Sequence, residues 1–540
     1  MTAGDADSAA GWRLGAVEES GTTVRSRWVA ARSLSVPLVL LLVLRLPSLF
    51  EPHWYTDEAG YTNVAWQMAH GKVLFLTTWN NKPPLLFWIL QVGVGIGGAS
   101  EFGIHLLSTA TEVCALVATW ILARGYLSPR RVWFAMLVTA FFLATPIFNG
   151  DLALPENFLI GMTPWAMVAV LAALRASGRT RSVILATVAG ALFAAAILIQ
   201  QTALADLGAG ILIMLVVSRG RWWLPAATAV SAAVLIGVVM APFVIAAGLH
   251  NVIFFLVTSY SGYTSQSLHP SFSALASRGA AGLLLLVGAW TARKWPAERL
   301  LPWVWLAVLL LAYGLPNRDY LHFLLPAVPA AALLLARLQT PRWRAWRSRP
   351  GMVGAPLLGA VAIGTVIWGG LVGAGLNSGS LFTVRLTGEY YPAFVGKLTG
   401  ALTTDEYVSL YDQRAIAEHD AVAWIKQNHL AGSTAVVWSA DSWAYLLGDL
   451  RPILPEPTIY ENSALLGNSE LLRRVEADRP VVVILTSDAY TAYGPILPVL
   501  QKGYTEVEAS FDGQLWIRSD VAARVLTAAQ ANTDLHRGRA

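Results

Sequence analysis

Residues 34–61 read LSVPLVLLLVLRLPSLFEPHWYTDEAGY, an apolar run that leads into two adjacent carboxylates, Asp57 and Glu58. A helix needs roughly 20 apolar residues to cross about 30 Å of hydrocarbon, and the run at 34–50 approaches that length. Ionisable groups beside a bilayer are costly unless they are paired or solvated, so they often mark substrate pathways. The stretch therefore predicts a membrane span followed directly by a candidate functional site.

The composition predicts a polytopic membrane protein. Hydrophobic residues make up 55% of the 540 residues and charged residues only 13%, which is far from the balance of a soluble globular protein. The net charge of +5 comes mainly from arginines that cluster between apolar runs. This pattern is typical of membrane topology and not of a nucleic-acid-binding surface, so we expect no nucleic-acid partner.

The length criterion, applied along the whole chain, predicts about eleven spans. They lie at residues 34–50, 103–124, 132–149, 157–174, 182–200, 203–218, 222–247, 279–292, 300–315, 322–338 and 353–375. Residues 1–33 are polar and the first apolar run lacks a small-residue cleavage site. We therefore expect a cytoplasmic tail at 1–33 and an uncleaved first helix.

Arginine clusters fall on alternate connections between the predicted spans. They lie at 124–131, 175–181, 219–221, 293–299 and 337–349. The positive-inside bias predicts that these connections are cytoplasmic. The remaining connections, and everything after about residue 376, are then extracytoplasmic.

The apolar segment Pro83–Gly98 is short and bounded by a Pro-Pro pair and glycines. If it crossed the membrane, every later arginine cluster would face outward. We therefore predict juxtamembrane helices at 62–71 and 84–97 that lie along the outer surface.

The character of the sequence changes after residue 376. We predict a linker at 376–410, a soluble extracytoplasmic α/β domain at 411–525 and a disordered tail at 526–540. Within that domain the patterns favour helices at 419–429 and 469–477, strands at 435–438 and 481–485, and an edge strand at 515–517.

The predicted topology places many polar residues at the outer side. They are Asp57, Glu58, Asn81, Lys82, Asp151, Glu156, Gln200, Gln201, Arg318, Asp319 and His322. A carboxylate can take a proton from a hydroxyl nucleophile, and a lysine or arginine can hold a phosphate. We therefore expect group transfer from a lipid phosphate, with Asp57 as base and with Lys82 and Arg318 as phosphate ligands.

Four motifs resemble those of GT-C glycosyltransferases, in particular the aminoarabinose transferases of lipid A and the dolichyl-phosphate-mannose protein mannosyltransferases. The motifs are Asp57-Glu58-Ala59-Gly60-Tyr61, Lys82-Pro83-Pro84-Leu85, Leu154-Pro155-Glu156-Asn157, and Asn317-Arg318-Asp319-Tyr320 followed by Phe323-Leu324-Leu325-Pro326. The resemblance covers residues 34–340 and implies a GT-C-like catalytic domain at 34–375. It also implies an inverting transfer of a sugar from a polyprenyl-phosphate donor to a lipid, glycan or protein acceptor in the cell envelope.

The resemblance suggests a role for each candidate residue. The acidic residue matching Asp57 acts as base or positions the acceptor, the lysine matching Lys82 contacts the donor phosphate, and the carboxylate matching Glu156 lines the cavity. Glu58 is a further catalytic candidate, although it would equally favour a helix N-terminus. The candidate substrate contacts are Asn81, Arg318, Tyr61 and His322, and packing is the alternative for His322.

One departure from the family motifs bears on cofactor use. Aminoarabinose transferases carry a glutamate directly before the lysine, associated with a bound metal, whereas this chain has Asn81. An amide can hydrogen-bond a sugar or phosphate but lacks the charge of a metal-binding carboxylate. The sequence therefore requires no cofactor, and a divalent metal stays an open alternative.

Two other functions fit the same residues. A transporter or flippase of lipid-linked sugars would also place charges along a lipid path. Alternatively, the C-terminal domain is a glycan-binding or partner-docking module and the membrane part is its scaffold.

Overall fold

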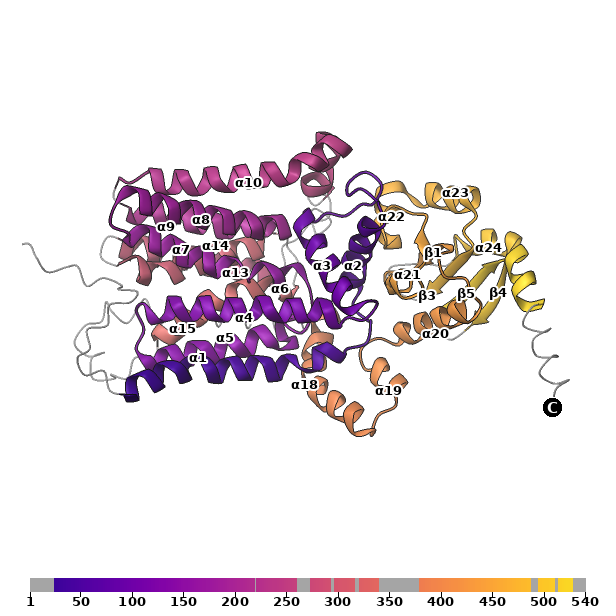
Figure 1. The fold of residues 1–540 in the computed structure, drawn as a ribbon, viewed down its shortest axis with the longest axis horizontal. Coiled ribbons are helices and arrows are strands. Elements are labelled where there is room, and N and C mark those ends of the chain that lie inside the picture. The colour runs from indigo at the N-terminus through magenta and orange to yellow at the C-terminus, as the bar shows by residue number, and fades with distance from the viewer. Residues whose placement is uncertain are drawn as a thin grey trace, which may run out of the picture.

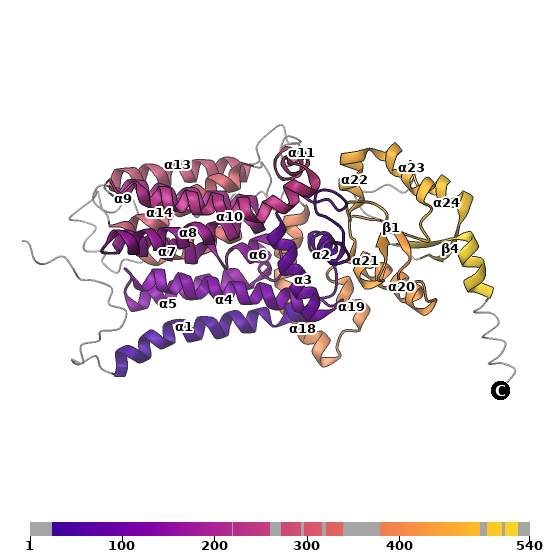
Figure 2. The same cartoon turned by 45° about the horizontal axis from the view of Figure 1, so that its top comes forward.

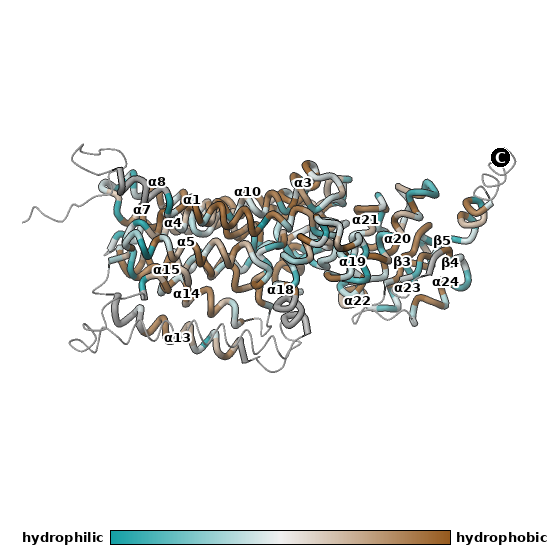
Figure 3. The backbone as a smooth tube through the Cα atoms, turned by 90° about the horizontal axis from the view of Figure 1, so that it is seen from below, coloured by the Kyte–Doolittle hydropathy of each residue, from teal (hydrophilic) through white to brown (hydrophobic). Residues whose placement is uncertain are grey.

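The computed structural model describes residues 24–218, 220–259, 272–292, 296–315, 320–338, 378–486, 494–509 and 513–527. A bundle of long helices occupies one end of the molecule and a small sheet domain the other (Figure 1). Most of the bundle is apolar along its length, whereas apolar and polar residues alternate in the sheet domain (Figure 3). The predicted fold class, a helical polytopic membrane protein with a C-terminal α/β domain, is confirmed.

The long helices of the bundle each overlap one predicted span, although the first begins at Val24, within the segment expected to be a tail. They are α1 (Val24–Arg45), α4 (Phe102–Arg124), α5 (Pro129–Ala144), α7 (Thr163–Arg175), α8 (Arg179–Ile199), α9 (Leu204–Val217), α10 (Trp223–Ala247), α13 (Phe272–Ala292), α14 (Ala297–Gly314) and α15 (Val328–Leu338). Within the described ranges, six helical stretches are individually long and apolar enough to cross a membrane. The span predicted at 353–375 lies outside the described residues.

The arginine-bearing connections gather at one end of the bundle. Arg175 pairs with Glu298, and the Arg221 guanidinium donates a hydrogen bond to the carbonyl of Leu174 (2.6 Å). Arg337 likewise donates to the carbonyl of Arg299 (2.8 Å). This placement agrees with the expectation that these connections share one side of the membrane.

Short elements build the opposite end of the bundle. They are η1 (Pro47–Phe50), α2 (Thr56–Ala69), α3 (Pro84–Gly97), η2 (Pro146–Phe148), α6 (Pro155–Leu159), η3 (Gln201–Ala203), α11 (Leu249–Ile253), the π-helical turn η4 (Phe254–Thr258) and η5 (Leu321–Ala327). Both α2 and α3 lie between the bundle and the sheet domain (Figures 1 and 2). Helix α2 begins earlier than predicted, so Asp57 and Glu58 stand in its first turn and not in a loop. Carboxylates are favoured there by the helix dipole.

Glycines let α3 fold back closely against the start of α4. A Cβ at Gly103 would lie 2.0 Å from the carbonyl oxygen of Gly93, and a Cβ at Gly97 would lie 2.6 Å from the amide nitrogen of Gly103. Only residues without a side chain permit this approach. The tight contact fixes α3, and with it the Lys82-Pro83 segment, to the bundle.

The C-terminal part begins with two helices in the segment expected to be a linker, α18 (Ser378–Thr399) and α19 (Thr404–Ser409). The sheet domain follows, with strands β1 (Thr434–Trp438), β2 (Arg451–Pro452), β3 (Val482–Thr486), β4 (Tyr504–Ala509) and β5 (Gly513–Arg518) in the order β2-β1-β3-β5-β4. Its helices are α20 (Gln413–Gln427), α21 (Trp443–Leu447), α22 (Ile459–Leu466), α23 (Asn468–Asp478) and α24 (Leu497–Gly503). Strand β1 runs parallel to β2 and β3, whereas β5 is antiparallel to β3 and β4.

The edge position predicted for residues 515–517 is wrong. Strand β5 pairs on both sides, with β3 and with β4, and its Leu515 and Trp516 are both buried, in cores on opposite faces of the sheet. The edge strand on this side of the sheet is β4, which the sequence pattern did not reveal because Glu506 and Glu508 interrupt its apolar residues. Charged side chains are typical of an edge strand, where they discourage pairing with other chains.

The sheet domain packs directly on α2 and the loop after it. Trp443 and Leu446 of α21 join the apolar core formed by α2, α3 and their neighbours. The amide of Trp79 donates to the carbonyl of Pro455 (2.9 Å), and Asn63 Nδ2 donates to the carbonyl of Ser442 (3.3 Å). These contacts place the C-terminal domain over the predicted site.

Candidate active site

Asp57, Lys82 and Glu156 come together from three separate segments. Asp57 stands in the first turn of α2, Lys82 precedes α3, and Glu156 stands in the first turn of α6. Asp57 interacts electrostatically with both Lys82 and Glu156. The structure therefore brings two carboxylates and a cation within electrostatic range of one another, at the end of the bundle that faces the sheet domain.

The protonation of Asp57 is set by its surroundings. Burial, reinforced by the nearby carboxylates Glu461 and Glu156, raises the pKa of Asp57 from 3.8 to about 6, although Lys82 acts in the opposite direction. A carboxylate with such a pKa is ionised at neutral pH yet a better proton acceptor than an ordinary aspartate. This raised pKa is compatible with the role of base that the sequence led us to expect for Asp57.

Lys82 is a largely enclosed cation. Its side chain is only 7% exposed, and its Nζ atom lies 5.7 Å from the ring centroid of Tyr61. The amide of Lys82 donates to Asn80 Oδ1 (3.1 Å), which shapes the turn before α3. A desolvated lysine attracts an anion more strongly than one in water, so this position suits a phosphate.

Glu156 is held by a neighbouring amide. Its Oε1 accepts a hydrogen bond from Gln200 Nε2 (2.6 Å). His322, on η5, interacts electrostatically with both Glu156 and Lys82, and its ring stacks on Tyr320. The structure thus places His322 and Tyr61 with the site, whereas Arg318 lies outside the described residues.

Asn81 contributes its backbone. Its carbonyl accepts a hydrogen bond from Gln201 Nε2 (2.6 Å), which also donates to the carbonyl of Leu256 (3.2 Å). The side chain at this position is an amide, which lacks the charge of a metal-binding carboxylate. We therefore assign no reaction step to a metal at Asn81.

Glu58 is directed toward α4. Its Oε1 lies 3.0 Å from His105 Nε2 and accepts a hydrogen bond from the amide of Ala153. Adjacent residues on a helix project about 100° apart, which explains why Glu58 and Asp57 have different surroundings. Glu58 is 1% exposed and lies behind the site.

The sequence did not reveal the contribution of α22 to the site. Tyr61 interacts electrostatically with Glu461 and Tyr460, and a Cβ at Gly60 would lie 3.7 Å from Thr458 Cγ2. Glu461 Oε2 accepts a hydrogen bond from Thr458 Oγ1 (3.3 Å). No local pattern marks these residues, because they reach the site only through docking of the C-terminal domain.

A buried ion pair supports the segment that carries Glu156. Arg45 Nε lies 3.3 Å from Glu112 Oε2, with both side chains almost fully buried. The Arg45 guanidinium also donates to Ser108 Oγ (3.0 Å) and to the carbonyl of Gly150. The signal in the sequence was a charged residue inside each of two spans, which is costly unless the charge is paired.

Comparisons with known proteins agree with the resemblance seen in the motifs. The model of the family described as dolichyl-phosphate-mannose-protein mannosyltransferase matches residues 81–246. No curated protein matches the chain in sequence.

Solved structures show a similar fold. The structure of ArnT from Cupriavidus metallidurans bound to undecaprenyl phosphate has a TM-score of 0.56 at 15% identity, and covers 91% of this chain and 98% of its own. The apo state of the same protein has a TM-score of 0.57 at 16% identity, with 92% and 98% covered. The apo oligosaccharyltransferase of Archaeoglobus fulgidus has a TM-score of 0.46 at 12% identity, with 86% and 70% covered. The family model and the ArnT structures confirm the predicted resemblance to GT-C glycosyltransferases, and the ArnT structures show that the shared fold extends over nearly the whole chain.

Proposed function

We propose that this protein transfers a sugar from a polyprenyl-phosphate donor to an acceptor hydroxyl at the extracytoplasmic face of the cell membrane. The observation that carries the proposal is the electrostatic interaction of Asp57 with Lys82 and Glu156, at the end of the bundle opposite the arginine-bearing connections. The raised pKa suits Asp57 to the role of base. Burial suits Lys82 to the role of phosphate ligand.

The reaction is a single displacement. Asp57 takes the proton of the acceptor hydroxyl as its oxygen forms a bond to the anomeric carbon of the sugar. The bond between that carbon and the phosphate oxygen breaks on the opposite side, so the anomeric centre is inverted. The polyprenyl phosphate leaves with its electron pair beside Lys82, and Glu156 orients the acceptor or sugar.

The comparisons support the donor class. The matched family is described by a dolichyl-phosphate-mannose donor and a protein acceptor, and one similar structure holds undecaprenyl phosphate. Dolichyl phosphate and undecaprenyl phosphate are both polyprenyl phosphates, so we assign a sugar carried on a polyprenyl phosphate as the donor of the present chain. The acceptor, in this proposal, is a component of the cell envelope.

The orientation follows from charge. The arginine-bearing connections lie in the cytoplasm by the positive-inside bias, so the site and the C-terminal domain face outward. This side also suits a lipid-linked donor, since nucleotide sugars are scarce there.

The test is an isosteric change at the base. We expect Asp57→Asn to lower sugar transfer by at least about a hundredfold, which is within the range for loss of a general base. Membrane insertion and the thermal midpoint should stay close to those of the wild type. Asp405→Asn is the matched control, because Asp405 is exposed on α19 and should leave transfer unchanged. Full activity of the Asp57→Asn protein would refute the assignment.

A further inference from the structure

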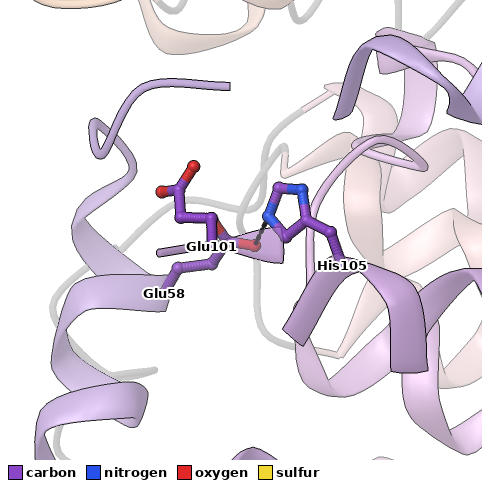
Figure 4. A group of neighbouring side chains, drawn as sticks. All are labelled: Glu58, Glu101 and His105. Atoms are coloured by element: carbon purple, nitrogen blue, oxygen red, sulfur yellow. Dashed lines mark hydrogen bonds and ion pairs between the residues drawn. The ribbon is translucent and has the colours of Figure 1, made fainter. Parts of the chain in front are cut away.

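A second polar cluster lies behind Asp57 and takes no part in the proposed transfer. It consists of Glu58 on α2, Glu101 at the start of α4 and His105 in the first turn of α4 (Figure 4). One ligand atom from each residue lies within 4.8 Å of the other two. The three side chains are 1%, 3% and 0% exposed, respectively. Their type, spacing and enclosure raise the question of what holds them together.

The tautomer of His105 is fixed by the backbone. Its Nδ1 lies 2.6 Å from the carbonyl oxygen of Ser48. A carbonyl can only accept a hydrogen bond, so Nδ1 carries a proton. In the neutral ring, Nε2 then presents its lone pair to Glu58 Oε1 at 3.0 Å. Histidines that bind metals usually have this arrangement, with the second ring nitrogen donating to a carbonyl or carboxylate.

The surroundings of Glu101 favour a bound cation over a proton that His105 and Glu58 share. Among the described residues, neither carboxylate oxygen of Glu101 has a hydrogen-bond partner, and Glu58 Oε2 also lacks one. A proton between His105 and Glu58 would satisfy that pair but would leave Glu101 buried and alone. Buried carboxylates are normally paired or bound to a metal. The Arg45 guanidinium, which acts electrostatically on His105, is already engaged by Glu112.

We propose that Glu58, Glu101 and His105 bind one divalent transition-metal ion of the Zn²⁺ class. One imidazole nitrogen and two carboxylate oxygens form a donor set that suits Zn²⁺ better than Mg²⁺. Two ligand atoms at about 2.0–2.2 Å from a tetrahedral Zn²⁺ stand about 3.3–3.6 Å apart. Ligand atoms as far apart as 4.8 Å therefore approach each other by roughly 1 Å when the ion binds. Water would fill the fourth position.

The ion would have a structural role. It would join the first turn of α2 to the start of α4, directly behind Asp57, and so fix the direction of the base. Glu58, Glu101 and His105 are positioning residues in this scheme, because none of them touches the reacting atoms. The site is separate from Asn81, where the aminoarabinose transferases carry their metal-associated glutamate.

The experiment measures metal directly. The full chain is purified in detergent, stripped with a chelator and titrated with Zn²⁺, and bound metal is counted by mass spectrometry. We expect about one tightly bound ion per wild-type chain, and an affinity at least about tenfold lower in Glu101→Gln and His105→Gln. Zn²⁺ should also raise the thermal midpoint of the wild type and not that of Glu101→Gln. Glu418→Gln is the matched control, because Glu418 is a buried carboxylate of the sheet domain and should keep full binding.

Two outcomes would overturn the metal site. One is a folded wild-type protein that binds no Zn²⁺, and the other is a Glu101→Gln protein that binds as tightly as the wild type. If both site variants fail to fold, X-ray absorption of the Zn²⁺-loaded wild type decides, since a spectrum without an imidazole ligand would contradict the assignment. Asp57→Asn should retain the ion, so failure of this proposal is distinguishable from failure of the proposed transfer.

Discussion

Replacing Glu461 by Gln should change how sugar transfer depends on pH, although Glu461 belongs to a different domain from Asp57. Glu461 is the foremost of the neighbouring charges that raise the pKa of Asp57, after burial itself. The active base is the carboxylate, so activity is present above the pKa and is lost as the pH falls through it. Removing one negative neighbour stabilises the carboxylate and moves this loss to lower pH.

The size of the effect follows from the pKa of about 6. At pH 5 roughly a tenth of the Asp57 side chains would be ionised, and kcat/KM should fall about tenfold per pH unit below the midpoint. Because burial is the larger cause, we expect Glu461→Gln to lower the midpoint by about 0.5–1 pH units. Activity at pH 5, relative to pH 7.5, should then rise about three- to fivefold.

The assay measures kcat/KM for sugar transfer by reconstituted protein from about pH 4.5 to about pH 8. Glu470→Gln is the control, since Glu470 is on α23 and pairs with Arg473 and Arg474. Its profile should coincide with that of the wild type. If kcat/KM of Glu461→Gln falls at the same pH as that of the wild type, or at a higher pH, the placement of α22 beside Asp57 is refuted.

The remaining predictions concern stability, read as the thermal midpoint of the detergent-solubilised protein. Arg45→Met should destabilise the fold by about 3–5 kcal/mol, because it leaves Glu112 charged and buried without its partner; an unchanged midpoint would contradict the ion pair. Gly103→Ala should cost about 1–3 kcal/mol, because its Cβ would lie 2.0 Å from the carbonyl oxygen of Gly93. Gly95→Ala, in the same helix as Gly93 but with open space at its Cβ, should instead gain up to about 1 kcal/mol, and equal effects of the two changes would argue against the close helix contact.

The sequence was sufficient for the features that depend on local patterns. Membrane spans are visible because each one must be apolar over its whole length, and the arginine clusters mark alternate connections. Asp57, Lys82 and Glu156 could be grouped without a structure, because each stands at the outer end of a span or in an outer loop. Residues on opposite sides of the membrane cannot form one site, so the predicted topology strongly limited which residues could lie together.

The sequence could not predict features that depend on the docking of the C-terminal domain or on the direction of a side chain. Glu461 reaches Asp57 only because α21 packs on α2, and nothing near residue 461 indicates that contact. Glu58 follows Asp57 directly, so the sequence grouped the two, whereas one helical step turns Glu58 toward His105. The edge position of β4 depends on strand order, which local alternation does not determine.

The most direct test of the proposed function uses wild-type protein in liposomes with a labelled polyprenyl-phosphate sugar and a cell-envelope extract as acceptor. We predict a new glycosidic product with an inverted anomeric centre, and one free polyprenyl phosphate for each sugar transferred. Movement of intact donor across the bilayer, without product or free lipid phosphate, would identify a flippase and contradict the transfer reaction.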